Sequence, residues 1–337
     1  MKILADASLP HLNDLFSVPF RLTRYANQET LENALPSHDI LLCRSTLKIT
    51  SNLLKNSHIQ CVATASSGID HIDSNYLNTQ NIKLFDAKGC NASAVADYVL
   101  ASLAYLKALD PADKPRGVGV LSKPRGVGSV GVIGAGEVGS RVIKRLNALG
   151  FDVLAYDPFK PNFKSCSFQA LKNCDILCIH ANLHDIQPYP TKNSLDAKFL
   201  NQLKPNTIII NAARGGIVDE KALLNNNKNI IYCTDVYQNE PEINPYIIQY
   251  ATLCTPHIAG HSIEAKYNAV LHLSQKLHQY FGFKVPTPKQ NKSLKHANTH
   301  QTWEALALSL YSPILETQQL KQATHTKTAF LALRRAH

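Results

Sequence analysis

Three motifs in the second half of the chain each carry one side chain suited to acid/base chemistry or to binding an anion. They are I-N-A-A-R-G-G-I-V-D around Arg214, D-V-Y-Q-N-E-P around Glu240 and T-P-H-I-A-G around His257. An arginine presents a planar pair of donors that matches a carboxylate. A histidine can take the proton of a hydroxyl group, and a neighbouring carboxylate fixes its tautomer and favours its imidazolium form. We therefore expect Arg214 to anchor a carboxylate and His257, assisted by Glu240, to act as an acid/base.

Each of these residues also has an interpretation without chemistry. Arg214 precedes two glycines and could cap a helix, Glu240 precedes a proline and could be a solvated loop acid, and His257 could be a satisfied buried histidine. The three motifs follow a glycine-rich motif typical of nucleotide binding. Their conjunction in this order favours the functional interpretation.

The glycine-rich motif G-A-G-E-V-G follows an apolar segment, Ser129–Ile133, that we expect to be a strand. Its first glycine allows a tight turn, its second lets the backbone approach a pyrophosphate, and its third lets the next helix pack against the strand. The N-terminus of that helix offers N–H groups and partial positive charge to phosphates. The predicted cofactor-binding residues here are Gly134, Gly136, Glu137, Val138 and Gly139.

An acidic residue follows at the position expected to recognise the ribose of a dinucleotide. Asp157 ends the segment F-D-V-L-A-Y-D and lies 21 residues beyond Gly136, close to the usual spacing of about 20. A carboxylate there accepts hydrogen bonds from ribose hydroxyls and repels a 2′-phosphate, which favours NAD over NADP, although Lys160 and Lys164 are near in sequence. The alternative is a glycine-rich turn of an unrelated α/β domain.

Short apolar segments alternate with helical patterns along the whole chain. The segments are apolar on both faces, as is typical of parallel strands covered by helices on both sides. The predicted strands are Lys2–Asp6, Ile40–Arg44, Gln60–Ala65, Ile82–Ala87, Ser129–Ile133, Asp152–Tyr156, Ile176–His180, Thr207–Asn211, Ile230–Asp235 and Thr252–Thr255, and the predicted helices include Ala92–Leu109, Gly139–Leu149, Ser194–Leu203 and Glu264–Phe281. The alternation predicts a doubly wound α/β fold with the three motifs at carboxyl ends of strands, where open α/β sheets build their sites.

The composition is that of a globular protein with two domains. Of 337 residues, 45% are hydrophobic and 18% charged, and no apolar stretch approaches the ~20 residues of a membrane-spanning helix. Eight cysteines are scattered without a C-x-x-C pair, which indicates reduced thiols and a cytoplasmic location. We expect no membrane partner and no metal site.

The net charge of +10 is concentrated near the C-terminus, where residues 284–337 hold eight Lys or Arg and two Asp or Glu. A basic tail can bind nucleic acid. The chain has no recognisable nucleic-acid motif, so we interpret the charge as a solvated helical face and expect no nucleic-acid partner. The segment K-P-R-G-V-G occurs at residues 114–119 and again at 123–128, and we favour a local duplication over a basic phosphate-binding loop.

The order of these motifs resembles that of the D-isomer-specific 2-hydroxyacid dehydrogenases over about residues 1–283. The resemblance rests on G-A-G-E-V-G followed by A-R-G-G-x-V-D, D-V-x-x-x-E-P and P-H-x-A-G. It implies NAD as cofactor, Arg214 as substrate anchor, Glu240 as partner and His257 as acid/base. It also implies two Rossmann-like domains, a split substrate domain around an inserted NAD-binding domain.

The domain boundaries follow from this scheme and from two features of the chain. We place a crossing in the helix Ala92–Leu109 and a second boundary near Gly260. The predicted substrate domain is residues 1–105 and 261–283, the predicted NAD-binding domain is residues 106–260, and residues 284–337 form a tail.

Four segments in the first 92 residues resemble the branch of this family that oxidises 4-phospho-D-erythronate on a route to pyridoxal 5′-phosphate. They are M-K-I-L-A-D, C-R-S-T, A-T-A-S-S-G-I-D-H and K-G-C-N-A. This resemblance implies substrate contacts at Ser45, Ser66 and His261, and cofactor contacts at Asp157, Ala181, Asp235 and Gly260. Serine stands at 66 where the branch has threonine, and histidine stands at 261 where it has tyrosine.

The tail and the substrate both leave questions that the motifs do not answer. Segments Tyr311–Glu316 and Phe330–Arg335 resemble pieces of a dimerisation domain, which implies a homodimer with a shortened tail. A phosphorylated four-carbon acid needs a second cation besides Arg214; Arg44, Lys48 or His261 could supply it. The alternatives are a dehydrogenase for another D-2-hydroxy acid, such as 3-phosphoglycerate, and a catalytically inactive NAD-binding paralogue.

Overall fold

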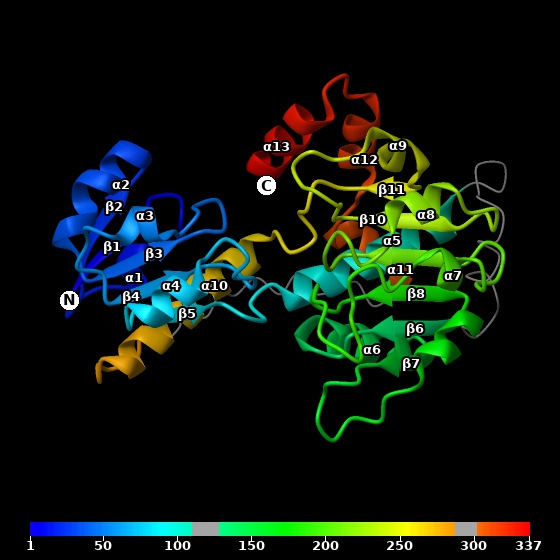
Figure 1. The fold of residues 1–337 in the computed structure, drawn as a ribbon, viewed down its shortest axis with the longest axis horizontal. Helices are drawn as coiled ribbons and strands as arrows, with labels where there is room; N and C mark the ends of the chain where they lie inside the picture. The colour runs from blue at the N-terminus through cyan, green and yellow to red at the C-terminus, as the bar shows by residue number, and fades with distance from the viewer. Residues whose placement is uncertain (110–127, 287–301) are drawn as a thin grey trace. The chain divides into compact units, whose positions relative to one another are not determined.

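The computed structural model describes residues 1–109, 128–286 and 302–337, which belong to two compact units (Figure 1). The first unit contains residues 1–91 and 261–294, and the second contains residues 92–260 and 295–337. The duplicated K-P-R-G-V-G segment lies outside the described residues except for its final glycine. Within the described ranges, no helix combines the length and the apolar character needed to cross a membrane.

The first unit is a five-stranded parallel sheet in the order β2-β1-β3-β4-β5. Its strands are β1 (Lys2–Asp6), β2 (Arg21–Tyr25), β3 (Ile40–Cys43), β4 (Cys61–Thr64) and β5 (Lys83–Asp86), and its helices are α1 (Leu12–Leu15), α2 (Gln28–Ala34), α3 (Ser51–Leu54), α4 (Ser74–Thr79), α10 (Ile263–Tyr280) and the short 3-10 helix Leu35–Ser37. Strands β3 and β4 are buried along their whole length. Helices α1 and α10 contribute to one apolar cluster, and α2, α3 and α4 contribute to the other.

The second unit is a six-stranded parallel sheet in the order β11-β10-β9-β8-β6-β7. Its strands are β6 (Ser129–Ile133), β7 (Asp152–Tyr156), β8 (Ile176–Ile179), β9 (Ile208–Asn211), β10 (Ile231–Thr234) and β11 (Leu253–Cys254), and the helices before residue 260 are α5 (Ala92–Ala108), α6 (Glu137–Ala148), α7 (Ala197–Leu200), α8 (Glu220–Leu224), α9 (Pro245–Tyr250) and the 3-10 helix Phe168–Asn173. Helices α5 and α6 contribute to one apolar cluster, and α7, α8 and α9 to another. The chain runs from β6 outward to β7 and then returns to β8, so the order of the strands reverses beside β6, which is where doubly wound sheets bind ligands.

Two parallel sheets with helices on both faces confirm the predicted α/β fold class. The sequence analysis missed one strand, β2. Its residues R-L-T-R-Y are mostly exposed, and the strand pairs only with β1 at the edge of the sheet. An edge strand needs no apolar run on both faces, so it lacked the signal by which the buried strands were predicted.

The two units divide after Asn91 rather than after residue 105. The reason is the packing of α5, whose residues Val99 and Leu103 are fully buried in one cluster with Val130 and Val132 of β6. Helix α5 therefore belongs to the second unit as a whole. A boundary placed inside this helix would divide a continuous apolar core.

Residues 302–337 form three helices that pack within the second unit: α11 (Trp303–Leu310), α12 (Ile314–Gln322) and α13 (Thr326–Ala336). Figure 1 shows α12 beside α9 and β11, and α13 packs on α12. Helix α11 packs on α5, where Lys107 forms an ion pair with Glu304. In α12, Thr317 Oγ1 accepts from the backbone N of Cys254 and donates to its carbonyl oxygen, both at 3.0 Å. The segment predicted as a separate tail is thus attached to the edge of the six-stranded sheet, at β11.

Candidate active site

The three motifs meet because they follow three neighbouring strands. Strand β10 pairs with β9 on one side and with β11 on the other, and Thr234 at its end is in register with Asn211 and with Cys254. Parallel strands present their carboxyl ends at one edge of a sheet. The loops that carry Arg214, Glu240 and His257 therefore start from the same edge.

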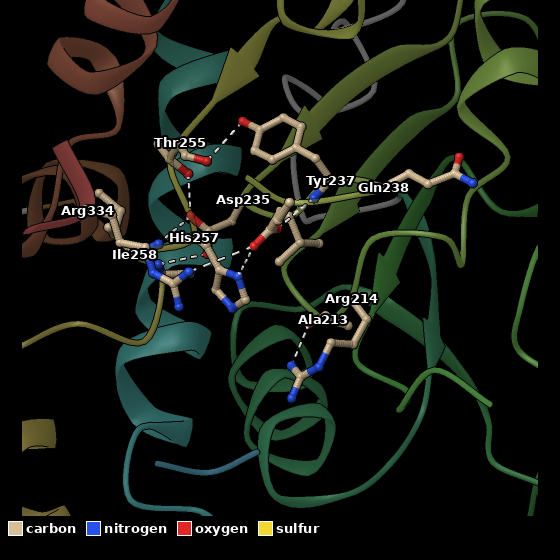
Figure 2. Close-up of polar contacts among 12 residues, drawn as sticks. Ala213, Arg214, Asp235, Tyr237, Gln238, Thr255, His257, Ile258 and Arg334 are labelled. Carbon is tan, nitrogen blue, oxygen red and sulfur yellow. Dashed lines mark hydrogen bonds and ion pairs between the residues drawn. The ribbon is translucent and has the colours of Figure 1, made fainter. Parts of the chain in front are cut away.

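The structure joins Glu240 and His257 directly. Nδ1 of His257 lies 2.7 Å from Oε2 of Glu240, and Figure 2 shows the imidazole pointing away from the sheet. The backbone N of Tyr237 donates to the other oxygen, Oε1, at 2.9 Å. Burial opposes the charge of Glu240, but His257 and the Tyr237 N–H together lower the pKa of Glu240 below its ordinary value. An ionised Glu240 keeps the proton of His257 on Nδ1 and leaves Nε2 for the substrate.

The backbone of His257 is held in an uncommon conformation. Its φ is +58°, in the left-handed region that non-glycine residues rarely adopt. The carboxylate of Asp235 accepts from the next two backbone N–H groups, Ile258 at 2.8 Å and Ala259 at 2.9 Å. It also accepts from Thr255 Oγ1 at 2.6 Å. Asp235 thus fixes the loop on both sides of His257, which a strained residue needs to persist.

Asp235 is buried, and burial raises its pKa to about 6 although the three donors act in the opposite direction. We predicted this residue as a cofactor contact. In the structure both carboxylate oxygens bind donors of the His257 loop. The geometry gives Asp235 a structural task, and its contact with a cofactor stays a prediction.

Further buried polar groups support this edge, and the sequence analysis did not identify them. Tyr237 Oη donates to the carbonyl of Thr255 at 2.9 Å, and Tyr98 Oη lies 3.0 Å from Thr255 Oγ1. The buried carboxylate of Glu220 accepts from the backbone N of Gln238 at 2.8 Å, and burial raises its pKa. Glu220 follows the motif I-V-D directly, whereas Tyr98 lies far away on α5 and gave no sequence signal.

Arg214 lies in a turn that is closed by hydrogen bonds with Asn211, a residue of the same motif. Asn211 Oδ1 accepts from the backbone N of Ala213 at 3.2 Å, and Asn211 Nδ2 donates to the carbonyl of Arg214 at 3.1 Å. The guanidinium donates from Nη1 to the carbonyl of Ala213 at 2.8 Å. A Cβ on the next residue, Gly215, would lie 1.8 Å from the carbonyl oxygen of Tyr237. Only glycine lets the Arg214 loop and the Glu240 loop touch, and this contact sets their spacing.

The glycine-rich loop has the features of an anion-binding helix start. Gly139 packs so closely that a Cβ there would lie 1.9 Å from the carbonyl oxygen of Gly134, whereas a Cβ on Gly136 would meet no atom within 4 Å. Gly136 is the N-cap of α6, and no side chain caps this helix. The start of α6 therefore has no side-chain cap for its first N–H groups and leaves room beside Gly136, which suits a bound pyrophosphate.

Four of the other predicted cofactor residues, Glu137, Val138, Asp157 and Ala181, lie in or beside this loop. Asp157 follows β7, and its Oδ2 accepts from the backbone N of Ala135 at 2.8 Å. Lys160 Nζ donates to the carbonyl of Ala135 at 2.5 Å. The backbone of Ala181 lies against Gly134, since a Cβ on Gly134 would be 2.6 Å from its N. Val138 packs against the α5–α6 cluster, and Glu137 forms an ion pair with Arg141 at 2.7 Å.

The predicted substrate residues Ser45, Ser66 and His261 all belong to the first unit. Ser45 is exposed after β3, and Ser66 Oγ donates to the carbonyl of Gly68 at 2.5 Å. His261 is exposed and precedes Ser262, which caps α10. Gly260 is the last residue of the second unit before the chain enters the first unit at His261. The Glu240–His257 pair therefore belongs to one unit and these three predicted substrate contacts belong to the other.

One residue near the Glu240–His257 pair comes from the C-terminal helix. Arg334 of α13 has its Nη1 4.0 Å from Oε2 of Glu240. The sequence signal was weak: Phe330 and Arg334 are four residues apart, on one face of a helix. The motifs, which all lie within the first 283 residues, could not place this helix, because only tertiary packing brings it to the site.

The second unit is similar to a known protein family. A family model described as D-isomer specific 2-hydroxyacid dehydrogenase, NAD binding domain, matches residues 122–259. The matched range contains the glycine-rich loop, Asp157, Arg214, Glu240 and His257. The features that fit a dinucleotide in the structure thus lie in a domain that binds NAD.

Relatives extend the similarity to the whole chain. The erythronate-4-phosphate dehydrogenase of Legionella pneumophila subsp. pneumophila (strain Philadelphia 1) is 50% identical, and the alignment covers 100% of this chain and 94% of that protein. The erythronate-4-phosphate dehydrogenase of Coxiella burnetii (strain RSA 331) is 33% identical over 96% of this chain and 87% of that protein. The NAD⁺-bound 3-phosphoglycerate dehydrogenase of Entamoeba histolytica has the same fold, with a TM-score of 0.67 and 20% identity over 86% of this chain and 99% of that chain.

Proposed function

Because the chain belongs to the D-isomer-specific 2-hydroxyacid dehydrogenase family, we propose that it oxidises 4-phospho-D-erythronate to 3-hydroxy-2-oxo-4-phosphooxybutanoate, with NAD, in pyridoxal 5′-phosphate biosynthesis. The observation that carries the proposal is the contact of 2.7 Å between His257 and Glu240 at the sheet edge that also carries Arg214. The 50% identity to a protein named erythronate-4-phosphate dehydrogenase supports the choice of substrate.

The chemistry assigned to the residues follows from this geometry. Arg214 binds the substrate carboxylate through its planar fork. Nε2 of His257 accepts the proton of the C2 hydroxyl, and Glu240, through Nδ1, stabilises the imidazolium that forms. Bound NAD supplies the acceptor for the hydride that leaves C2. In the reverse direction His257 returns the proton to the carbonyl oxygen.

The cofactor would be held by the loop between β6 and α6. The uncapped N–H groups after Gly136 suit the pyrophosphate, and Asp157, which already holds the backbone of this loop, suits the adenosine ribose. Ala181, Asp235 and Gly260 are proposed as further contacts. Ser45, Ser66 and His261 are proposed as contacts of the substrate from the first unit.

The assay that tests the function uses the purified full chain with NAD and either 4-phospho-D-erythronate or 3-phospho-D-glycerate. A 2-oxo acid is added to reoxidise any retained NADH, and products are identified by mass spectrometry. Selective oxidation of the four-carbon substrate is the expected result. Oxidation of 3-phospho-D-glycerate alone would move the protein to another branch of the family, and no turnover of either with NAD still bound would mean an inactive paralogue.

The assembly and the location are further parts of the proposal. We propose a homodimer, supported by the exposed Leu310 and Leu315, 63% and 61% exposed, near the junction of α11 and α12; light scattering of the purified chain tests it. We propose a cytoplasmic location, supported by eight cysteines that are all free, six of them buried. Fractionation of cells that express the protein tests the location.

A further inference from the structure

Helix α13 is fixed to the second unit by several independent contacts. Phe330 is fully buried, and its ring lies edge-on to Tyr237 with centroids 6.0 Å apart. At one end of the helix Lys327 forms an ion pair with Glu242, and at the other His337 Nε2 lies 2.8 Å from Glu316 Oε1. These contacts fix the position of α13, and therefore the position of the side chains that it places near Glu240.

Arg334 is the residue of α13 that lies near Glu240. It is one helical turn beyond Phe330, on the same face of the helix. Nη1 of Arg334 lies 4.0 Å from Oε2 of Glu240, the same oxygen that meets His257 Nδ1 at 2.7 Å. The side chain of Arg334 is 29% exposed. The guanidinium is thus held over the acid/base pair and still reaches solvent.

This arginine is not needed to satisfy the carboxylate. Glu240 already accepts from Tyr237 N through Oε1 and from His257 through Oε2. Glu240 also leaves the hydrogen-bond donors of Arg334 unused, because 4.0 Å is within ion-pair distance but too long for a hydrogen bond. A guanidinium has five N–H donors, and within the described ranges Arg334 makes only this one polar contact. Its donor capacity is available to an incoming anion.

The arrangement of charge indicates which anion. Figure 2 shows the imidazole of His257 between the guanidinium groups of Arg334 and Arg214. With Arg214 on the carboxylate and His257 on the C2 hydroxyl, a chain of carbon atoms that continues past C2 leads away from Arg214. The two guanidinium groups carry like charges, which repel each other, and a substrate with a negative group at each end relieves that repulsion.

We propose that Arg334 binds the phosphate of the substrate and is a specificity-determining residue of this active site. The inference rests on the proposed function, since it assumes Arg214 on the carboxylate and His257 on the hydroxyl. Arg334 thus takes the place of Arg44, Lys48 and His261, which the sequence suggested as the cation that binds the phosphate. Arg44 already donates from Nε to Asp6 at 2.9 Å.

The test compares Arg334→Gln with Arg335→Gln in the full chain. Arg335 is a matched control because it is the next residue of the same helix, carries the same charge and is exposed. KM and kcat are measured with 4-phospho-D-erythronate and with D-erythronate, which lacks the phosphate. We expect Arg334→Gln to raise KM for the phosphorylated substrate roughly 10- to 100-fold, the effect of one charged hydrogen-bonded contact, and to change KM for D-erythronate less than about threefold.

Two further measurements keep the test decisive. Arg334→Lys keeps the charge without the fork and should recover part of the lost affinity. Inorganic phosphate, used as a competitive inhibitor, should bind Arg334→Gln more weakly than the wild type or Arg335→Gln, and this readout needs no turnover of D-erythronate. NAD affinity and thermal unfolding of each variant show that the fold is intact.

The outcomes separate this inference from the proposed function. If the wild type does not oxidise 4-phospho-D-erythronate, the proposed function fails. If it does, and Arg334→Gln loses kcat/KM equally for both substrates, Arg334 acts only through Glu240 and the phosphate assignment is wrong. Equal kinetics of Arg334→Gln and Arg335→Gln would overturn it as well.

Discussion

Glu240 holds His257 with one oxygen while the backbone of Tyr237 holds the other, at 2.7 Å and 2.9 Å respectively. The carboxylate therefore cannot rotate without losing a hydrogen bond. Because an ionised carboxylate only accepts, the proton must lie on Nδ1 and the lone pair of Nε2 is available to the substrate. The imidazole of His257 is thus oriented before any ligand binds.

Replacing Glu240 with glutamine tests this orientation. The amide can still accept from Tyr237 N with its oxygen, but its NH₂ group then faces Nδ1 of His257 and favours the wrong tautomer. We expect kcat to fall about 10²- to 10⁴-fold with NAD affinity nearly unchanged, measured by steady-state kinetics and calorimetry. A variant that keeps normal turnover would show that His257 needs no ionised partner.

Arg214→Lys tests the substrate anchor. Lysine keeps the positive charge but cannot form the planar pair of hydrogen bonds with a carboxylate. We expect kcat/KM to fall at least about tenfold, since one charged hydrogen bond is lost, while the melting temperature stays close to that of the wild type. Lys221→Arg, on the exposed side of α8, is a control for a conservative exchange of a basic residue. Near-normal kinetics of Arg214→Lys would remove Arg214 from the anchor role.

Asp157→Ala tests the cofactor preference. The variant loses the acceptor proposed for the ribose hydroxyls and also the hydrogen bond from Ala135 N, which shapes the glycine-rich loop. The loss of loop order weakens NAD and NADP alike, whereas the loss of the ribose acceptor weakens NAD alone. Binding constants by fluorescence titration should therefore show a larger loss for NAD. An equal loss for both would mean that the ribose is recognised elsewhere.

The fold could be predicted from the sequence where the strands are buried and apolar on both faces. Strands β3, β8 and β9 are buried along their length and were predicted within two residues. The edge strand β2 was missed because its residues are mostly exposed and form no apolar run. The attachment of α11, α12 and α13 to the second unit was also missed, because it depends on contacts such as Thr317 with Cys254, 63 residues apart in sequence.

The site shows the same limit. Glu240 and His257 were predicted to cooperate because each follows a predicted strand and because a carboxylate beside a histidine suits acid/base chemistry. The structure confirms the contact. Tyr98, Glu220 and Arg334 support or extend the site from helices. Helical patterns predict which face is buried but not what the buried residue meets, so these contacts needed the structure.

Asp235→Asn tests how the His257 loop is held, through the pH dependence of stability. Burial raises the pKa of Asp235 to about 6 from an ordinary value of 3.8. Between these two pH values the folded protein keeps a proton that the unfolded chain has released. Raising the pH from about 4 to about 6 therefore lowers the free energy of unfolding, by about 3 kcal/mol from this residue, and the cost stays constant above pH 6. Asparagine has no such titration.

The measurement is urea unfolding of wild type and variant at several pH values between 4 and 8. Carboxylates with lowered pKa values, such as Asp6 and Asp175, give the opposite slope at low pH but contribute equally to both proteins. The difference between the two proteins therefore isolates Asp235. We expect the variant to be least stable relative to wild type near pH 4, since it loses a hydrogen bond to Ile258 or Ala259 and gains nothing from protonation. Parallel curves would show that Asp235 stays ionised throughout, and that its three hydrogen bonds outweigh its burial.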